Sequence, residues 1–186
     1  MRTEIRAEEL GLSGVYLITP SSYHDARGGF FKNFEERMLL DKGIKPYFYE
    51  EFFTTSKKGV IRGLHYQRGE HSQAKFIWCF KGRIFDVVVD LRKYSPTFGK
   101  WISVDLSEDN MKTLYIPRGM AHGFLTLSEE ASILYKMDNR FSPENERGIG
   151  YNDKTLGIDW PKMEVNYILS AKDKNWGTFA DCEKFD

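Results

Sequence analysis

The sequence predicts an all-β protein whose strands form a sandwich or a barrel. From residue 59 onward, short apolar runs alternate with turn residues, which is typical of antiparallel strands and not of alternating strands and helices. Aromatic residues make up 15% of the chain, and their side chains favour strands. Because no repeat, low-complexity tract or proline-rich linker interrupts the chain, we expect residues 1–186 to form a single domain with an N-terminal arm and a C-terminal tail.

The first elements are two strands with a short helix between them. Residues 14–20 and 47–54 are apolar and aromatic enough to be strands. Residues 35–42 have helical composition and end before Gly43, a typical cap. We therefore expect short helices only at the periphery of the strands.

The remaining strands follow one another closely. Residues 75–80 and 83–91 flank Lys81-Gly82, which predicts a hairpin. The tail is richer in polar and turn residues, so we expect it to pack on the outside. Further strands are predicted at 100–106, 113–117, 123–128 and 132–138, and the tail at 151–186.

Two polar residues lie on strands that are otherwise apolar. Side chains alternate between the two faces of a strand, so Asp86 in the strand at 83–91 points either at solvent or into a wet cavity. Tyr135 shares an apolar face of the strand at 132–138, where a tyrosine is usually a core residue with a bonded hydroxyl. Taken alone, neither residue indicates a function.

Charge and cysteine content narrow the class of protein. Lys plus Arg number 27 and Asp plus Glu number 27, so nothing favours nucleic acid as a partner, although a small anionic ligand needs only a few local cations. Cys79 lies in an apolar run and should be buried, and with Cys182 it forms no disulfide framework or zinc spacing. The charged N-terminus and the lack of a membrane-spanning stretch predict a cytoplasmic protein without a membrane partner.

The spacing Pro-x-Gly-x-x-His at 117–122 resembles the second half of the cupin signature, a β-barrel whose mouth often holds a metal. Cupin metal sites generally need a His-x-His pair and a carboxylate before that segment, but His65 is followed two places later by Gln67. His65 and His122 without a placed carboxylate make a poor divalent site, so we expect no metal. A metal-dependent cupin, such as a sugar isomerase, stays open as an alternative.

The chain as a whole resembles the dTDP-4-dehydrorhamnose 3,5-epimerase family, metal-free cupin-fold enzymes of deoxysugar biosynthesis. The resemblance runs from about Gly14 to Asp173. It implies a jelly-roll β-sandwich or barrel, no cofactor, and a homodimer in which an exchanged N-terminal strand helps to complete the neighbour's site. It rests on Asp25-Ala26-Arg27-Gly28, Gly59 through Gln67, Phe85 through Arg92, Ser95 through Lys100, Ile116 through Phe124, Asn152-Asp153 and Trp160-Pro161.

The reaction that the resemblance implies inverts C3, C5 or both in a 4-keto-6-deoxyhexose that is linked to a nucleotide, dTDP in the family. Protons on these carbons lie beside the ketone, so removing one gives an enolate. By the resemblance, His65 of the segment Arg-Gly-Leu-His is the base and Asp173 supports it. Tyr135 is the acid, and Lys75 lies near the developing oxyanion. A sugar-nucleotide-binding jelly roll without catalysis is the alternative from another class.

The resemblance also implies a set of substrate contacts. Arg27, Arg62 and Lys172 should contact the sugar nucleotide, and their cationic groups suit its diphosphate. The remaining contacts are Lys75 and His122 at the sugar, Glu146 at the nucleotide end, and Phe141, where the family commonly has a tyrosine that stacks on the base.

Some residues depart from the family pattern. Lys32 replaces a usual glutamate, and Glu50 and Phe52 replace the two amides of Gln-x-Asn. Lys32 and Glu50 could compensate each other as a swapped polar pair, but Phe52 puts an apolar ring in place of an amide. Two alternatives therefore stay open: the substrate is a related 4-keto sugar, or the reaction inverts only C3 or only C5.

The spacing of Arg62 and His65 makes a geometric prediction. Residues three apart lie on opposite faces of a regular strand. Both can reach one cavity only if the chain bends between them, and Gly63 permits such a bend.

Overall fold

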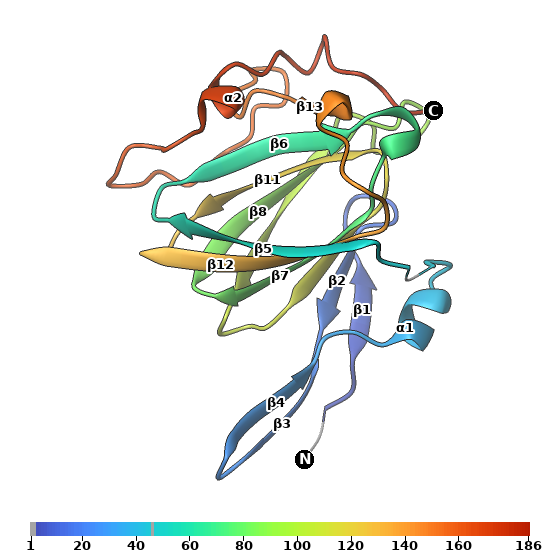
Figure 1. Ribbon diagram of the computed structural model, residues 1–186, viewed down its shortest axis with the longest axis vertical. Coiled ribbons are helices and arrows are strands. Elements are labelled where there is room, and N and C mark those ends of the chain that lie inside the picture. The colour runs from blue at the N-terminus through green and yellow to red at the C-terminus, as the bar shows by residue number, and fades with distance from the viewer. Residues whose placement is uncertain (1–2, 46) are drawn as a thin grey trace.

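The computed structural model describes residues 3–45 and 47–186, which form two antiparallel β-sheets that face each other (Figure 1). The predicted all-β, cupin-type jelly roll is confirmed. The first sheet has the strand order β1 (Arg6–Glu9), β2 (Tyr16–Thr19), β10 (Thr113–Ile116), β7 (Lys75–Lys81), β12 (Glu130–Met137) and β5 (Glu50–Lys57). The second has the order β13 (Glu146–Gly148), β6 (Ile61–Gln67), β11 (Met120–Thr126), β8 (Arg83–Asp90) and β9 (Trp101–Ser107).

The remaining elements lie outside the two sheets. A separate hairpin, β3 (Ser21–Asp25) with β4 (Gly28–Lys32), projects from the body (Figure 1). Helix α1 (Glu36–Leu40) lies against the first sheet, where its Leu39 packs with Ile18 and Phe76. Helix α2 (Ala171–Lys174) lies over β6, and short 3-10 turns span Gly69–His71 and Pro143–Asn145.

The space between the sheets is apolar at one end and polar at the other. Because side chains alternate along a strand, Ile77 and Ile133 of the first sheet meet Ile84, Val88 and Phe124 of the second in the core. Towards the other end, the same inner faces carry ionisable and aromatic side chains around a cavity. A single pair of sheets therefore supplies both the core and the candidate site.

The tail covers the outer face of the second sheet. Val87, Val89 and Leu125 on that face form a second core with Leu156 and Trp160. Because β8 is covered on both faces, its sequence is apolar on both faces except at Arg83, Asp86 and Asp90.

The predicted hairpin at Lys81-Gly82 is wrong. Strand β7 pairs with β10 and β12, whereas β8 pairs with β9 and β11, so the chain crosses from one sheet to the other at Gly82. Gly82 has a φ of +74°, and a Cβ there would lie 2.0 Å from the Glu130 carbonyl oxygen. A glycine that suits a hairpin turn suits a sheet-to-sheet corner equally well, so the local sequence does not distinguish them.

Other predicted elements differ in their bounds. The strand predicted at 47–54 begins only at Glu50, and the helix predicted at 35–42 is limited to Glu36–Leu40. The strand predicted to begin at residue 123 begins at Met120. His122 therefore lies within a strand.

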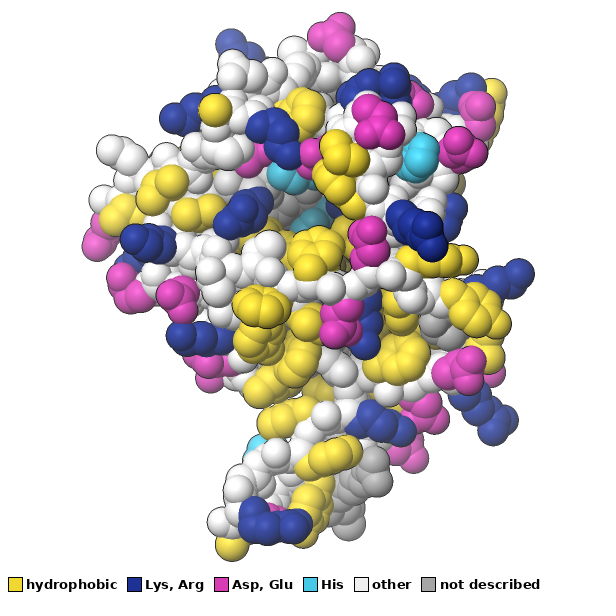
Figure 2. Space-filling model, viewed as in Figure 1, with side chains coloured by type: hydrophobic (Ala, Val, Ile, Leu, Met, Phe, Trp, Pro, Cys, Tyr) yellow, Lys and Arg dark blue, Asp and Glu magenta, His cyan; other side chains and the backbone are white. Residues whose placement is uncertain are grey.

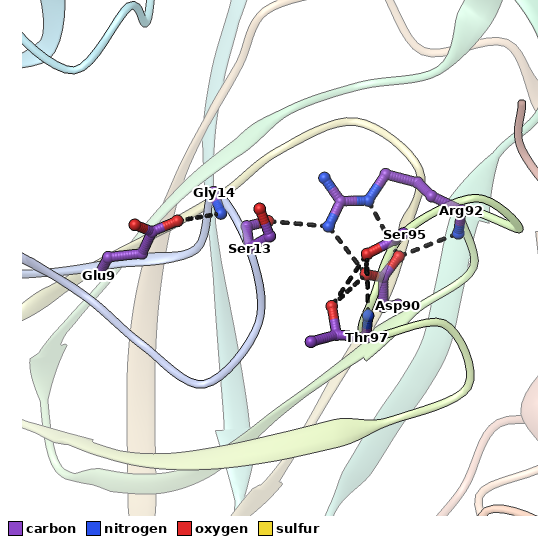
Figure 3. Close-up of polar contacts among 7 residues, drawn as sticks. All are labelled: Glu9, Ser13, Gly14, Asp90, Arg92, Ser95 and Thr97. Atoms are coloured by element: carbon purple, nitrogen blue, oxygen red, sulfur yellow. Dashed lines mark hydrogen bonds and ion pairs between the residues drawn. The ribbon is translucent and has the colours of Figure 1, made fainter.

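A polar corner ties the N-terminal arm to the body (Figure 3). The Asp90 carboxylate accepts hydrogen bonds from Arg92, Ser95 and Thr97. The Arg92 guanidinium also donates to the Ser13 carbonyl at 2.8 Å. Since Asp90 is fully buried, these donors supply the hydrogen bonds that its charge needs, and they hold the arm next to the end of β8.

Candidate active site

A cavity of about 520 Å³ opens between the two sheets, and histidine side chains are visible within the hollow (Figure 2). A cavity of that size accommodates a small organic ligand. Seven of the predicted site residues belong to it or to its mouth. They are His65, Lys75, Tyr135, Arg62, His122, Phe141 and Glu146, and the other lining residues are Glu50, Phe52, Thr54, Tyr66, Gln67, Gln73, Phe124 and Met137.

His65 reaches the cavity from β6, and its ring is hydrogen-bonded to the buried carboxylate of Asp173. Its Nε2 lies 2.5 Å from Asp173 Oδ1, and the Asp173 side chain is only 5% exposed. Burial alone would raise the pKa of Asp173, but the hydrogen bonds from His65 and its neighbours lower it below its ordinary value. A carboxylate at Nε2 makes that nitrogen the N–H donor, which leaves Nδ1 as the basic nitrogen of the ring.

The tail holds Asp173 in place. The Asp173 backbone N–H donates to Ser170 Oγ at 3.0 Å, which caps helix α2. The Trp176 indole N–H donates to Asp173 Oδ1 at 3.2 Å, and its ring meets His65 edge to face. A residue 108 positions away in the chain is thereby brought to the imidazole.

Tyr135 enters the same cavity from β12 on the first sheet. Its ring is stacked on Phe52, with centroids 5.0 Å apart, and meets His122 edge to face. Burial, followed by the charge of Asp86, raises the pKa of the Tyr135 phenol well above its ordinary value. The phenol therefore keeps its proton at neutral pH and can serve as a proton donor.

Arg62 and His65 both line the cavity, so the predicted bend in β6 is confirmed. Gly63 has a φ of +132°, and the pairing of β6 with β11 shifts register next to it. A Cβ at Gly63 would lie 2.5 Å from the Gly123 Cα, so only glycine fits between these strands. The Arg62 guanidinium is directed by hydrogen bonds to Ser56 and Thr55 of β5.

Three ionisable groups lie in or behind the cavity wall. Burial lowers the pKa of Lys75 to about 8, and its Nζ donates to the His65 carbonyl at 3.2 Å. His122 Nε2 lies 2.8 Å from Asp86 Oδ2, and both side chains are buried. Burial lowers the pKa of His122 and raises that of Asp86, and it outweighs the opposite effect that each partner has on the other.

Asp86 is a buried residue behind the cavity to which the sequence analysis assigned no role. It neither faces solvent nor lines the cavity, because it is fully buried and bonded to His122. The sequence could have predicted that Asp86 is buried, because it alternates in β8 with the core residues Ile84 and Val88 and so shares their inner face.

The mouth of the cavity carries Glu146 and Phe141. The predicted contact Lys172 does not line the cavity itself, but its Nζ donates to Glu146 Oε2 at 2.6 Å. Phe141 is 48% exposed, and its backbone N–H donates to Glu50 Oε1 at 3.0 Å. The exposed Phe141 ring gives the mouth a flat apolar surface on which an aromatic group can stack.

Arg27 is the one predicted contact that lies far from this cavity. It occupies the tip of the β3–β4 hairpin, where it pairs with Asp25 and its side chain is 87% exposed. The suggested Lys32–Glu50 pair does not form within the chain, because Lys32 bonds to Glu35 and Glu50 to the Phe141 amide.

Metal ligands and membrane-spanning helices are both missing from the part of the chain that the structure describes. Residues 3–45 and 47–186 contain no group of three or more His, Cys, Asp and Glu side chains arranged to hold a metal ion. Within the same residues, no helix has the length and apolar character needed to cross a membrane.

Comparisons with known proteins agree on one family. The family model described as dTDP-4-dehydrorhamnose 3,5-epimerase matches residues 9–181. The enzyme of that name from Salmonella typhimurium is 47% identical over 160 residues, which cover 86% of this chain and 87% of the relative.

Solved structures resemble the chain over nearly its whole length. The dTDP-6-deoxy-D-glucose-3,5-epimerase RmlC from Legionella pneumophila, in complex with dTDP-4-keto-L-rhamnose, has a TM-score of 0.91 and 38% identity, over 97% of this chain and 95% of that chain. ChmJ, a 3'-monoepimerase from Streptomyces bikiniensis in complex with dTDP-quinovose, has a TM-score of 0.86 and 31% identity, over 92% and 86%.

Proposed function

This chain belongs to the dTDP-4-dehydrorhamnose 3,5-epimerase family, and we propose that it inverts carbons beside the ketone of a dTDP-linked 4-keto-6-deoxyhexose with His65 as base and Tyr135 as acid. The observation that carries the proposal is that these two side chains come from opposite sheets and line one cavity. A sugar ring bound between them meets a base on one face and a proton donor on the other, as inversion requires.

The reaction proceeds through an enolate. Nδ1 of His65 removes the proton from the carbon next to the ketone, and Asp173 stabilises the imidazolium that forms. The electrons of the C–H bond move onto the ketone oxygen, where the Lys75 ammonium stabilises the negative charge. Tyr135 then donates its proton to the carbon from the opposite face, which leaves a phenolate. Exchange of protons with solvent returns both side chains to their starting states.

The substrate is bound by groups at the cavity mouth. Arg62 and Lys172 attract the diphosphate, and Phe141 offers its exposed ring to the base. His122 contacts the sugar. A dTDP-linked substrate is supported by the ligands of the Legionella and Streptomyces relatives, which are dTDP-sugars.

A homodimer is part of this proposal. The β3–β4 hairpin projects from the body (Figure 1), and Arg27 at its tip does not line the cavity of its own chain. We infer that the hairpin of one protomer extends to its partner and brings Arg27 to the partner's cavity. We also place the protein in the cytoplasm, a reducing compartment that suits its two free cysteines, Cys79 and Cys182.

Inversion at a single carbon is the second candidate. The likeness to ChmJ, a 3'-monoepimerase, supports it, as does the replacement of a family amide by Phe52 in the cavity wall. The two candidates share the first deprotonation and differ only in whether both carbons react.

The test is incubation with dTDP-4-keto-6-deoxyglucose in D2O, with deuterium at C3 and C5 followed by NMR. We expect deuterium and inversion at one carbon or at both, unchanged after dialysis of the protein against EDTA. Tyr135→Phe should reduce inversion more than deuterium uptake. Binding without any deuterium uptake would favour a non-catalytic sugar-binding protein, and activity lost with EDTA and restored by a metal would favour a metal-dependent cupin.

A further inference from the structure

Phe52 occupies a distinctive place beside the proposed acid. It lies on β5, directly opposite Tyr135 of β12, so both side chains point to the inner face of the sheet. The two rings are nearly parallel, with an interplanar angle of 13° and centroids 5.0 Å apart. Phe52 also lines the cavity and is 41% exposed.

Strand β5 is the edge of the six-stranded sheet, so among the described residues no further strand of that sheet lies beyond Phe52. The Tyr135 ring has the Phe52 ring over one face and the His122 ring at its edge. Tyr135 is only 7% exposed even though its neighbour strand is the last one of the sheet. The Phe52 ring therefore covers one face of the Tyr135 ring on the edge side of the sheet.

The position of the phenol matters because the enolate has two ways to regain a proton. Tyr135 delivers a proton to the opposite face and completes the inversion. If His65 returns a proton instead, the carbon regains its starting configuration. In D2O this event is seen only as deuterium on a carbon that has not been inverted. Misplacing a catalytic group by about 1 Å can slow its reaction about 100-fold. If the phenol were loosely held, the return of a proton from His65 would therefore be faster than protonation by Tyr135.

We propose that Phe52 is a positioning residue for Tyr135. Its ring fixes the orientation of the phenol and covers it at the edge of the sheet. The enolate is therefore protonated by Tyr135, which gives inversion. This inference rests on the proposed function. It concerns this chain in particular, because Phe52 stands where the family pattern has an amide.

The neighbouring Phe53 provides a matched control. It lies one residue further along β5 and opposite Leu134, so its side chain points to the outer face. It is 65% exposed and meets Phe80 edge to face, away from the cavity. A change at Phe53 removes an aromatic ring from the same strand without touching Tyr135.

The experiment measures inversion per deuterium incorporated in D2O, for Phe52→Ala, Phe52→Leu, Phe52→Tyr and Phe53→Leu. We expect the ratio to fall at least about tenfold in the Ala and Leu variants, because neither keeps a flat ring over the phenol. Phe52→Tyr keeps the ring and should stay within about twofold of the unchanged protein, as should Phe53→Leu. KM should change little in all four while kcat for inversion falls in the first two.

The outcomes separate this inference from the proposed function. If the unchanged protein incorporates no deuterium, the proposed function fails. If the unchanged protein incorporates deuterium and inverts, but Phe52→Leu has the same ratio of inversion to deuterium incorporated, only the role of Phe52 is overturned. Equal losses in Phe52→Leu and Phe52→Tyr would also overturn it, since the flat ring would then be irrelevant. Thermal unfolding of each variant confirms that the compared proteins are folded.

Discussion

At the scale of single residues, the tail holds the Asp173 carboxylate against His65, the proposed base. We predict that Asp173→Asn keeps the fold and reduces deuterium uptake on the order of 100-fold, because the imidazolium loses its counter-charge. Asp181→Asn is the control, since Asp181 is an exposed carboxylate of the same tail that bonds only to Thr178 among the described hydrogen bonds. Undiminished uptake in Asp173→Asn would show that His65 acts without this support.

Lys75 predicts how the reaction depends on pH. Burial lowers its pKa to about 8, so the side chain is charged below that pH and neutral above it. In the proposed reaction, stabilisation of the enolate needs the charge, and kcat/KM should therefore fall as the pH rises through about 8. Tyr135 does not account for this fall, because its pKa is raised well above its ordinary value.

Lys75→Arg tests the assignment. A guanidinium stays charged throughout this range, so the variant should lose the fall near pH 8 even if its activity at about pH 7 is lower. The measurement is kcat/KM from about pH 6 to about pH 10. A fall with the same midpoint in Lys75→Arg would assign it to another group.

At the scale of elements, β6 supplies two site residues from one face only because it bends at Gly63. We predict that Gly63→Ala destabilises the protein by more than about 2 kcal/mol, since the backbone has a φ of +132° and the new Cβ meets the Gly123 backbone. Gly28→Ala is the matched control, because Gly28 has a φ of +123° but no atom of residues 3–45 and 47–186 lies within 4 Å of the position that its new Cβ would take.

Urea unfolding at a fixed protein concentration measures both variants. The difference between them isolates the close approach of the two strands from the cost of the backbone conformation. Equal destabilisation by the two substitutions would mean that the contact with Gly123 relaxes easily. Lack of space would then not be the reason that the bend needs glycine.

At the scale of the whole molecule, the position of Arg27 predicts that a complete site needs two chains. A heterodimer of Arg27→Ala with His65→Ala, purified by two different tags, should show about half the activity of the unchanged dimer, because one cavity has His65 and receives Arg27 from its partner. Each variant alone should be nearly inactive.

The reciprocal heterodimer pairs an unchanged chain with one that carries both substitutions. If Arg27 acts across the interface, this pair has no complete site and should be nearly inactive. Activity of about half in this second pair, and none in the first, would place Arg27 in the cavity of its own chain. A monomer in sedimentation analysis would contradict the homodimer itself.

The sequence by itself determined the family and most strands of the two sheets, and it predicted a set of site residues whose roles stay predictions. Alternation of apolar side chains is a local property, so β8 and β12 could be predicted from their own residues. The segment around His65 and the distant Tyr135 indicated one reaction because the family pattern orders them along the chain. The bend at Gly63 followed from the face alternation of a strand together with the resemblance.

Only the tertiary structure decided which side chains meet. The crossing at Gly82, the Asp86–His122 pair and the stacking of Phe52 on Tyr135 each depend on which strands lie side by side or face to face. The separation of Arg27 from the cavity depends on the direction in which a hairpin leaves the body. Such contacts join residues far apart in sequence, and local patterns of polarity and turn residues carry no information about them.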